Sequence, residues 1–398
     1  MKNTEADRIL HFPANQVVGV IKYLDSAQLW RELCLAKGDV EIPSTQQTVM
    51  FSLKGFHSDK YASFSGQNLA FWNEMDAAGL DLITDVNLRG LSDATENELA
   101  CMSRLTRFDS LSIRGPLVKN LPADVLKRLM DITVDDANDD DLAALAHLCP
   151  QLKYLKIERS ACSDEGLSAL EPLSELRSLI LVANRERIDG SGLLSVSPTL
   201  TKLSIDCLAD DGSEWLSRFK NLESLWCHKS FRDSSMQAIS TCAKLKILSL
   251  AECMISDLGF RYVAQLTRLE SLFCQSSGIT GDALMMLRNL KNLRSVDVSD
   301  VEIEGSLTNL VELPVLEKLT AEHCQLDQRS VDAIGMMTSL RVAFLARNDF
   351  NQCSLSPLSN LSKLRKLSLG EAIKNSDVDD LLKALPDCEI TVGGKTRT

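Results

Sequence analysis

The sequence predicts an α/β solenoid, a chain wound into short coils that each contain one strand and one helical segment. The spacing of apolar residues changes inside a coil. In the stretch 245–269, Leu248 and Leu250 alternate with other residues, as in a strand. Further along, Phe260 and Val263 stand three residues apart, as on successive helical turns. One strand followed by one helical turn closes a coil, after which the pattern begins again.

The first apolar position of the coil recurs along most of the chain, in steps of 21 to 25 residues. The pattern Leu-x-x-Leu-x-Leu follows it in most coils, which defines a leucine-rich repeat. We therefore predict a curved horseshoe with a parallel β-sheet on the concave face and short helices on the convex face. The predicted starts of its about 13 repeats are Ile83, Phe108, Leu129, Leu152, Leu176, Leu200, Leu222, Leu245, Leu269, Leu293, Leu316, Leu340 and Leu364.

The extent of the pattern predicts three regions. Residues 1–80 lie outside the repeat and are expected to form an N-terminal cap, because the bare apolar end of a first coil would aggregate. Residues 81–392 form the solenoid, in which Ile390 and Val392 lie on a closing strand. Residues 393–398 form a polar tail.

Inside the capping region, β-branched residues predict strands at 17–24 and 48–55, and apolar spacing predicts a short helix at 68–79. A second interpretation stays open for residues 9–35, which resemble an F-box. They have a Pro near the start, helical apolar spacing and a Leu-Asp pair. This alternative makes the chain a ubiquitin-ligase substrate adaptor that recruits the ligase through this segment and binds substrates with its repeats. The β-branched run around Gly19 argues against it, because it is a poor helix former.

The repeats resemble those of bacterial leucine-rich-repeat proteins of the cysteine-containing type, with about 24 residues per repeat and a [Ser/Thr]-Asp-x-Gly segment after the strand. That segment is found at Ser163–Leu167 and Ser256–Gly259. The resemblance extends to a short capping domain through Phe12, Pro13, Val18, Gly19, Trp30, Ala36, Gly38, Val40, Ile42 and Pro43. It implies the fold and says almost nothing about the biochemical role. The coils that start at Leu129 and Leu200 lack the Asn or Cys of this pattern, so we expect local irregularity there.

Charge and composition limit the partners. The formal net charge of −12 disfavours binding to a nucleic-acid backbone and permits a basic protein partner. The sequence has neither an N-terminal apolar segment typical of a secretory signal nor a run of about 18 apolar residues. We therefore expect a cytoplasmic monomer that contacts neither membrane nor nucleic acid.

The chain has 12 cysteines. Cys227 and Cys274 take a core strand position, whereas Cys253 and Cys324 take the Asn/Cys position, from which a side chain reaches backbone groups. There is no Cys-x-x-Cys pair, so neither a zinc ribbon nor a thioredoxin-like motif is indicated. Reduced thiols are the expectation for such a protein.

The sequence predicts no enzyme, cofactor or metal site. An acidic cluster at 131–141 allows a calcium site, but it lacks the EF-hand spacing, and we favour Asp141 or a neighbour as a helix cap with the other carboxylates solvated. Adjacent strand residues point to opposite faces, so His323 and Cys324 are not expected to form a nucleophile–base pair. The segment 393–396 lacks the first Gly of a P-loop.

The third, fifth and seventh positions of each repeat are expected on the concave face. In the first four repeats these positions are polar or charged. From the fifth to the ninth repeat they are mostly aromatic, aliphatic and small polar residues, and only Lys202 and Asp206 are formally charged. Trp226 and Phe273 lie two strands apart, or roughly 10 Å. The surface predicts a protein or peptide partner, although a sheet that tolerates β-forming residues or a covering N-terminal segment also explains it. The candidate partner-binding residues are Ile180, Val182, Trp226, His228, Ile247, Phe273, Gln275 and Phe344.

Overall fold

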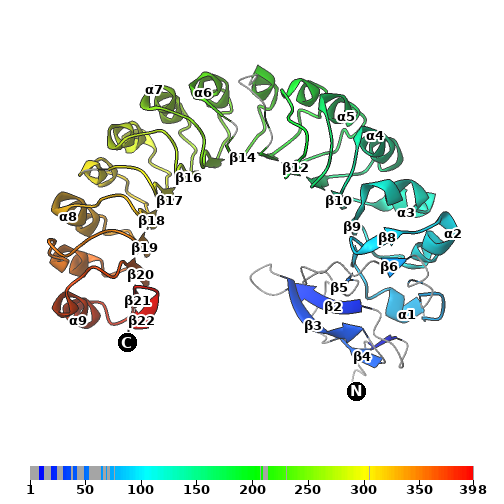
Figure 1. Cartoon of the computed structure of the whole chain (residues 1–398), viewed down its shortest axis with the longest axis horizontal. Coiled ribbons are helices and arrows are strands. Elements are labelled where there is room, and N and C mark those ends of the chain that lie inside the picture. Colours follow the sequence, from blue (N-terminus) through cyan, green and yellow to red (C-terminus); the bar gives the residue numbers. More distant parts are fainter. Residues whose placement is uncertain are drawn as a thin grey trace, which may run out of the picture. The chain divides into compact units, whose positions relative to one another are not determined.

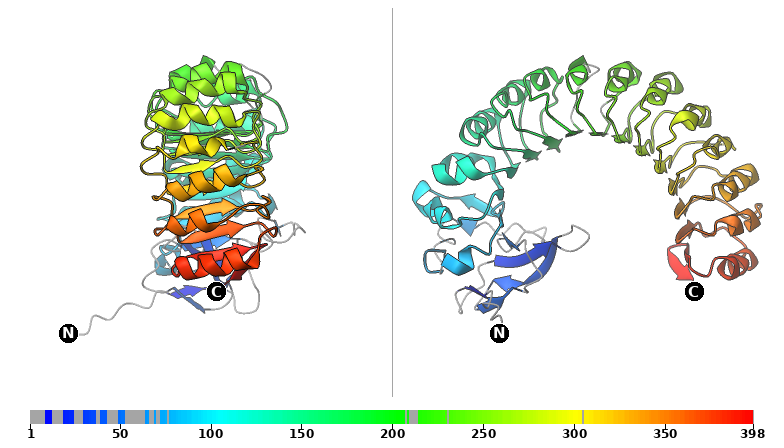
Figure 2. Two further views of the ribbon diagram at one scale, coloured as in Figure 1. Left: turned by 90° about the vertical axis from the view of Figure 1, so that its left-hand side faces the viewer. Right: turned by 180° about the vertical axis from the view of Figure 1, so that it is seen from behind.

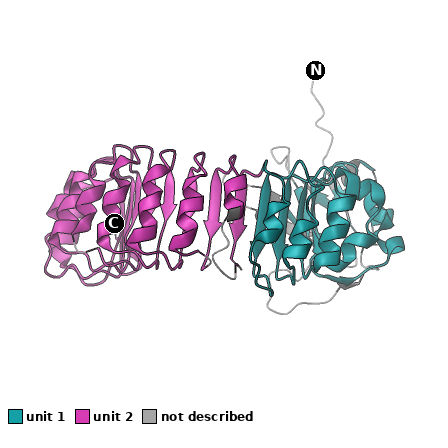
Figure 3. Cartoon of the chain, turned by 90° about the horizontal axis from the view of Figure 1, so that it is seen from above, with its two compact units in different colours: residues 1–199 teal, residues 200–398 magenta. Residues whose placement is uncertain are grey.

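The computed structural model contains two compact units, residues 1–199 and 200–398 (Figure 3). Within the described residues, no helix is both long and apolar enough to cross a membrane. The described residues are 9–12, 19–24, 30–36, 39–42, 49–52, 64–65, 69, 72–75, 77–206, 208, 214–229, 231–303 and 305–397.

Unit 1 contains a mixed sheet in the order β3–β2–β5–β7–β9–β10–β11–β12, with the pairing antiparallel at β3–β2 and β2–β5 and parallel from β5 onward. The strands are β1 (Ile9–His11), β2 (Gly19–Leu24), β3 (Trp30–Ala36), β4 (Asp39–Glu41), β5 (Val49–Ser52), β6 (Phe64–Ser65), β7 (Asp85–Asn87), β8 (Leu91–Asp93), β9 (Ser110–Arg114), β10 (Asp131–Asp135), β11 (Tyr154–Glu158) and β12 (Ser178–Val182). The helices are α1 (Ala77–Leu80), α2 (Glu96–Leu99), η2 (Ala100–Arg104), η3 (Gly115–Asn120), α3 (Ala123–Arg128), α4 (Asp139–Leu148), α5 (Asp164–Ser168) and η4 (Ser191–Leu194).

The N-terminal segment continues the repeat sheet, because β5 pairs in parallel with β7, the strand of the first repeat. Its apolar side chains pack against one another: the ring of Phe51 lies 6.2 Å from Phe12 and 5.2 Å from Trp72, centroid to centroid. Phe51 and Trp72 are fully buried. This segment thus adds strands and an aromatic core to the end of the first coil.

Two expectations for this segment need correction. Glu74 and Met75 form a turn and a bend. Within the described residues, the single helix expected at 68–79 is therefore replaced by a short 3-10 segment at 72–73 and by α1. An F-box requires helices in the segment 9–35. The structure instead pairs β2 with β3 as antiparallel strands, so the fold of this segment does not support the adaptor interpretation.

In unit 2 the strands β13 to β21 pair in parallel as successive neighbours, and the helices follow one another on one face of the sheet (Figures 1 and 2). The strands are β13 (Lys202–Ile205), β14 (Ser224–Cys227), β15 (Ile247–Ser249), β16 (Ser271–Phe273), β17 (Ser295–Asp297), β18 (Lys318–Thr320), β19 (Val342–Leu345), β20 (Lys366–Leu369), β21 (Glu389–Val392) and β22 (Lys395–Arg397). The helices are η5 (Glu214–Arg218), α6 (Asp233–Ser240), α7 (Asp257–Phe260), η6 (Arg261–Gln265), η7 (Gly281–Asn289), η8 (Ser306–Leu310), α8 (Gln328–Met336), η9 (Ser356–Asn360) and α9 (Asn375–Ala384).

The predicted register is confirmed by burial. Repeat leucines such as Leu225, Leu248 and Leu272 are fully buried between sheet and helices, while alternate residues of the same strands face the other side. Ile390 and Val392 lie on β21, as predicted. In place of a bare polar tail, Lys395–Arg397 pairs antiparallel with β21 and covers its free edge.

Side chains at the Asn/Cys position bond to the backbone of the preceding repeat, as predicted. The Cys253 thiol donates to the carbonyl of Cys227 over 3.5 Å, and the Cys324 thiol donates to that of Val298 over 3.1 Å. The irregularity expected after Leu129 is absent from β10, which pairs over five residues with each neighbour. After Leu200, β13 pairs with β14 over four residues, whereas residues 207 and 209–213, which follow the strand, lie outside the described residues.

The cysteines of the described core are buried thiols, among them Cys227, Cys253 and Cys274. Burial raises the pKa of the Cys227 and Cys274 thiols well above the usual range. Because only the thiolate reacts, we expect slow alkylation at these three cysteines in the folded protein and rapid alkylation in denaturant. Time-resolved labelling with mass spectrometry measures this. A native disulfide in a non-reducing digest of fresh protein contradicts the prediction.

Candidate binding surfaces on the two sheets

The open face of each sheet, which is the side away from the helices, carries the candidate residues. In unit 2 the fifth repeat positions form a row across the strands, because Trp226 pairs in register with Ser249 and Ser249 pairs with Phe273. Since the core residues on either side of each position point inward, this row points outward. Ser249 is small and 5% exposed, so it forms a floor between the two rings.

Trp226 and Phe273 form one stacked unit, here called the aromatic pair. Their ring centroids are 5.2 Å apart and their planes differ by 26°. The sequence predicts roughly twice this separation from the strand spacing. The distance shortens because both side chains lean across Ser249. The indole N–H of Trp226 donates to the hydroxyl of Ser224 over 2.8 Å, which fixes the ring, and the residue remains 36% exposed.

Other predicted residues surround the aromatic pair. Ile247, on the strand between the two aromatic residues, is half-buried. His228 follows β14, and its Nε2 lies 2.9 Å from the carboxylate of Glu252, which also pairs with Lys229 over 3.1 Å. The Oε1 atom of Gln275 is shielded from solvent and accepts no hydrogen bond from the described residues.

Phe344 does not join the aromatic pair. It lies on β19, and the strands β17 and β18 separate it from Phe273, with Asp297 and Thr320 in the intervening fifth positions. The ammonium group of Lys318 lies 5.5 Å from the Phe344 ring centroid, so this aromatic already holds a cation. The structure therefore divides the predicted residues of unit 2 into a compact cluster and a separate aromatic.

Ile180 and Val182 belong to unit 1. Both are half-buried on the open face of β12, in register with Lys156 and Glu158 of β11. They border a network of charged side chains and form a separate candidate surface within their own unit.

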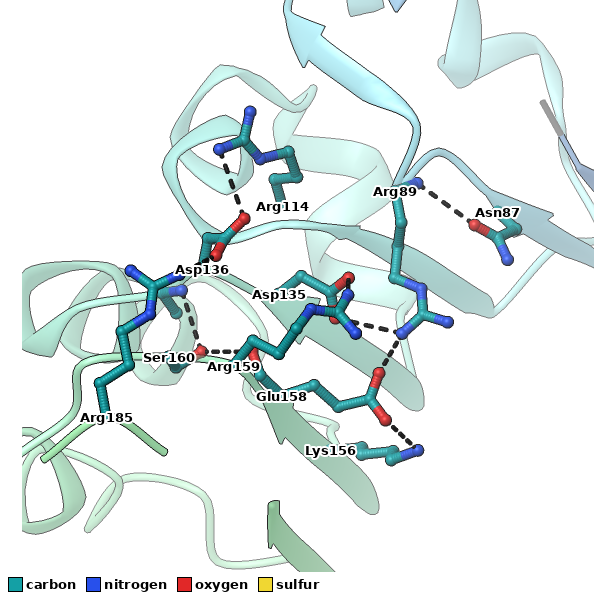
Figure 4. A network of polar contacts seen from close by, with 11 residues as sticks. Asn87, Arg89, Arg114, Asp135, Asp136, Lys156, Glu158, Arg159, Ser160 and Arg185 are labelled. Atoms are coloured by element: carbon teal, nitrogen blue, oxygen red, sulfur yellow. Dashed lines mark hydrogen bonds and ion pairs between the residues drawn. The ribbon is translucent and has the colours of Figure 1, made fainter. Parts of the chain in front are cut away.

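This network joins side chains from successive repeats (Figure 4). The Arg89 guanidinium pairs with Asp135 over 3.1 Å and also with Glu158. Lys156 pairs with Glu158, and Arg159 pairs with Asp135. Burial raises the pKa of Asp135 in spite of its two arginine partners. Burial also opposes ionisation of Glu158, but its hydrogen bond to Lys156 and the Arg89 charge hold its pKa below the usual range.

Most of the acidic cluster at 131–141 is therefore structural. The expectation of solvated carboxylates is wrong for Asp135 and Asp136, whereas Asp140 is exposed, as expected. Asp136 pairs with Arg114 over 3.4 Å and with Arg185 over 2.6 Å. Asn138, rather than Asp141, caps α4; Asp141 is its reciprocal partner in a capping box. The described part of the chain contains no group of three side chains able to hold a metal ion.

Asp131 differs from these carboxylates because no arginine or lysine neutralises it among the described residues. Burial raises the pKa of Asp131 to about 7, and the charges of Asp85 and Asp109 act in the same direction. In the unfolded chain an Asp has a pKa near 3.9. The folded state thus retains a proton that the unfolded state loses between about pH 4 and 7. The free energy of unfolding therefore falls as pH rises through this window.

Replacing Asp131 by Asn removes this dependence. We expect the Asp131→Asn variant to be about as stable as wild type at pH 4 and more stable at pH 8, by about 1–3 kcal/mol. Urea unfolding at both pH values measures the difference. Asp387→Asn, at an exposed carboxylate, provides the matched control and should not change the pH dependence. Equal pH profiles for Asp131→Asn and wild type contradict the assignment.

His323 and Cys324 do not form a nucleophile–base pair. His323 Nδ1 lies 2.8 Å from Asp300, while the Cys324 thiol is buried against the carbonyl of Val298. Burial raises the pKa of Cys324 to about 11. The sequence predicts that His323 and Cys324 point to opposite faces of a strand. The structure separates their side chains in another way, because His323 lies in a turn after the strand and has a left-handed backbone conformation, with φ of 54°.

Repeat register, buried leucines and backbone-bonded Asn and Cys side chains define a leucine-rich-repeat fold in both units. No family model matches the chain. Among solved structures, the chain is similar to an internalin from Listeria monocytogenes, with 18% identity and a TM-score of 0.53 over 79% of this chain and 81% of the internalin. It is also similar to a chain of the mouse RP105/MD-1 complex, with 18% identity and a TM-score of 0.56 over 85% of this chain and 57% of that chain. At such identities the likeness establishes the fold, the solenoid that the sequence predicts.

Two curated proteins match parts of the sequence. One is a putative adenylate cyclase regulatory protein of Trypanosoma equiperdum, 28% identical over 178 residues, which are 44% of this chain and 28% of that protein. The other is disease resistance RPP13-like protein 4 of Arabidopsis thaliana, 25% identical over 151 residues, which are 35% of this chain and 18% of that protein. The match thus spans less than a third of either relative's length.

Proposed function

We propose that this chain is a cytoplasmic protein-interaction scaffold that binds a protein or peptide partner on the open face of unit 2. The aromatic pair of Trp226 and Phe273 is the observation that supports the proposal. A stacked pair of large rings on an open sheet face, set among serines, resembles the centre of a protein interface, where aromatic anchors are surrounded by small polar groups.

The low entropic cost of ordering these two side chains favours them as anchors. Each ring has only two side-chain torsions to order on binding, and the hydrogen bond to Ser224 together with the stacking already restricts the indole. A partner that covers the pair therefore gains apolar contact area at a small entropic cost. The RP105/MD-1 complex, one of the similar structures, is itself an assembly of two proteins, as its name states.

Trp226→Ala is expected to weaken binding of the partner at least tenfold, because truncating such an anchor typically costs about 2 kcal/mol of binding free energy. The melting temperature should change little, since the ring lies outside the core. The partner is first captured on the full chain from an extract of the source cells, and its dissociation constant is then measured by calorimetry against wild type and variant.

Phe273→Ala should weaken binding similarly. The double variant should lose less binding free energy than the two single variants together, because the rings act as one unit. Lys366→Ala, on the open face of β20, provides the control and should change neither binding nor stability. Full affinity in the Trp226→Ala variant, or its unfolding at room temperature, contradicts the proposal.

A further inference from the structure

We infer that the partner presents an arginine side chain, which stacks on Phe273 and pairs with Asp297, so that the recognised segment is a basic peptide. This inference rests on the proposed function, because it assigns the chemistry of the partner at the same surface. It depends on three features of the open face of unit 2: an aromatic face, a carboxylate with no cationic partner, and an unsatisfied acceptor.

The aromatic face and the carboxylate are neighbours. Phe273 of β16 pairs in register with Asp297 of β17, and both occupy the fifth repeat position on the open face. Trp226 lies on the β14 side of Phe273 and stacks on that side of its ring. Asp297 is the register partner of Phe273 on the β17 side, so a planar group that stacks on the face of the Phe273 ring not covered by Trp226 can reach the carboxylate of Asp297.

Asp297 has no cationic partner among the described residues, whereas other carboxylates of unit 2 do. Glu252 pairs with Lys229 over 3.1 Å, and Glu317 pairs with Arg294 over 2.9 Å. Among the described residues, the Asp297 carboxylate makes one hydrogen bond, an internal turn contact in which Oδ1 accepts from the backbone N–H of Ser299 over 3.0 Å. Its second oxygen is therefore available to a ligand, and the chain's net charge of −12 adds attraction for a cation.

The nearby lysine does not neutralise this carboxylate. Lys318 lies on the adjacent strand β18, but its ammonium group lies over the Phe344 ring of β19, on the other side from β17. This contact also shows that an aromatic of the same face accommodates a cation. Arginine suits the Phe273 site better than lysine, because a planar guanidinium stacks on a ring while its N–H groups bond to a carboxylate in the same plane.

Gln275 adds a third feature. It follows Phe273 by two residues, and its Oε1 accepts no hydrogen bond from the described residues. An unsatisfied shielded acceptor is unfavourable, so a turn of the amide toward a donor on the open face is favoured once that donor arrives. A guanidinium carries five N–H donors and can serve both Asp297 and Gln275.

The test uses the full chain and a random dodecapeptide display library. Peptides are selected on wild type and counter-selected on the Trp226→Ala/Phe273→Ala double variant, so that the survivors depend on the aromatic pair. We expect one position of the survivors to be enriched in arginine. In the peptide that binds most tightly, replacing that arginine by citrulline should weaken binding at least tenfold, because citrulline keeps the shape and removes the charge. Replacing it by lysine should weaken binding several-fold.

Asp297→Asn in the chain should weaken binding of the arginine peptide at least tenfold. The Asp297→Asn variant should then bind the citrulline peptide almost as well as it binds the arginine peptide, because both changes remove the same contact. The control Asp332→Asn, at an exposed position in α8, should have no effect on either peptide. Survivors without arginine, or an arginine whose effect is independent of Asp297, overturn this inference and leave the proposed function standing. The absence of any survivor after counter-selection counts against both.

Discussion

Deleting residues 1–80 should convert a monodisperse protein into one that self-associates. The deletion removes β5, whose backbone pairs with β7, and leaves the polar backbone groups of that edge unpaired. It also removes Phe51 and Trp72, which are buried at the end of the first coil. Core residues of the first repeat, such as Val86 and Leu88, then lie at an open end. An unpaired edge beside apolar surface is a template for aggregation.

Size-exclusion chromatography with light scattering measures the association of a fragment that starts at residue 81, and thermal unfolding measures its stability. Deletion of residues 393–398 provides the control at the other end of the chain. That deletion removes β22, whose side chains are exposed, so it bares one strand edge and no core and should leave the protein monodisperse. A monodisperse 81–398 fragment with an unchanged melting temperature would show that the cap is not needed.

Gly259→Ala should destabilise the protein by about 2–3 kcal/mol, although Ala usually favours a helix over Gly by about 1 kcal/mol. Gly259 lies in α7, where a Cβ atom would stand 2.2 Å from Oδ1 of Asp233 and 2.8 Å from its Cα. The Asp233 carboxylate cannot simply move away. It accepts hydrogen bonds from the backbone N–H of Ser256, over 2.7 Å, and from its hydroxyl.

The substitution therefore has to separate two neighbouring coils or break both of these bonds. Urea unfolding measures the loss, and Gln237→Ala, at an exposed position in the adjacent helix α6, provides a matched helix substitution that should stay within about 0.5 kcal/mol of wild type. A Gly259→Ala variant as stable as wild type would show that the close contact between Gly259 and Asp233 does not hold the two coils together.

The recurrence of apolar residues along the chain was enough to predict the solenoid, the repeat starts and the side of each strand that is buried. A strand alternates its side chains with a period of two, so the leucine positions of a repeat alone determine that Leu225 and Cys227 point inward and that Trp226 points outward. The same rule places Cys253 where its thiol meets a backbone carbonyl. These features depend on residues close in sequence, which a periodic pattern records.

Relations between neighbouring coils were decided only by the tertiary structure. The distance between Trp226 and Phe273 depends on how both rings lean across Ser249, and no spacing along the chain contains that choice. Likewise, Arg89 meets Glu158 across 69 residues of sequence. Such contacts form because long side chains on the parallel strands, or in the turns just after them, reach across neighbouring coils. A count of acidic residues therefore predicted a solvated cluster at 131–141, where the folded chain has an ion-pair network.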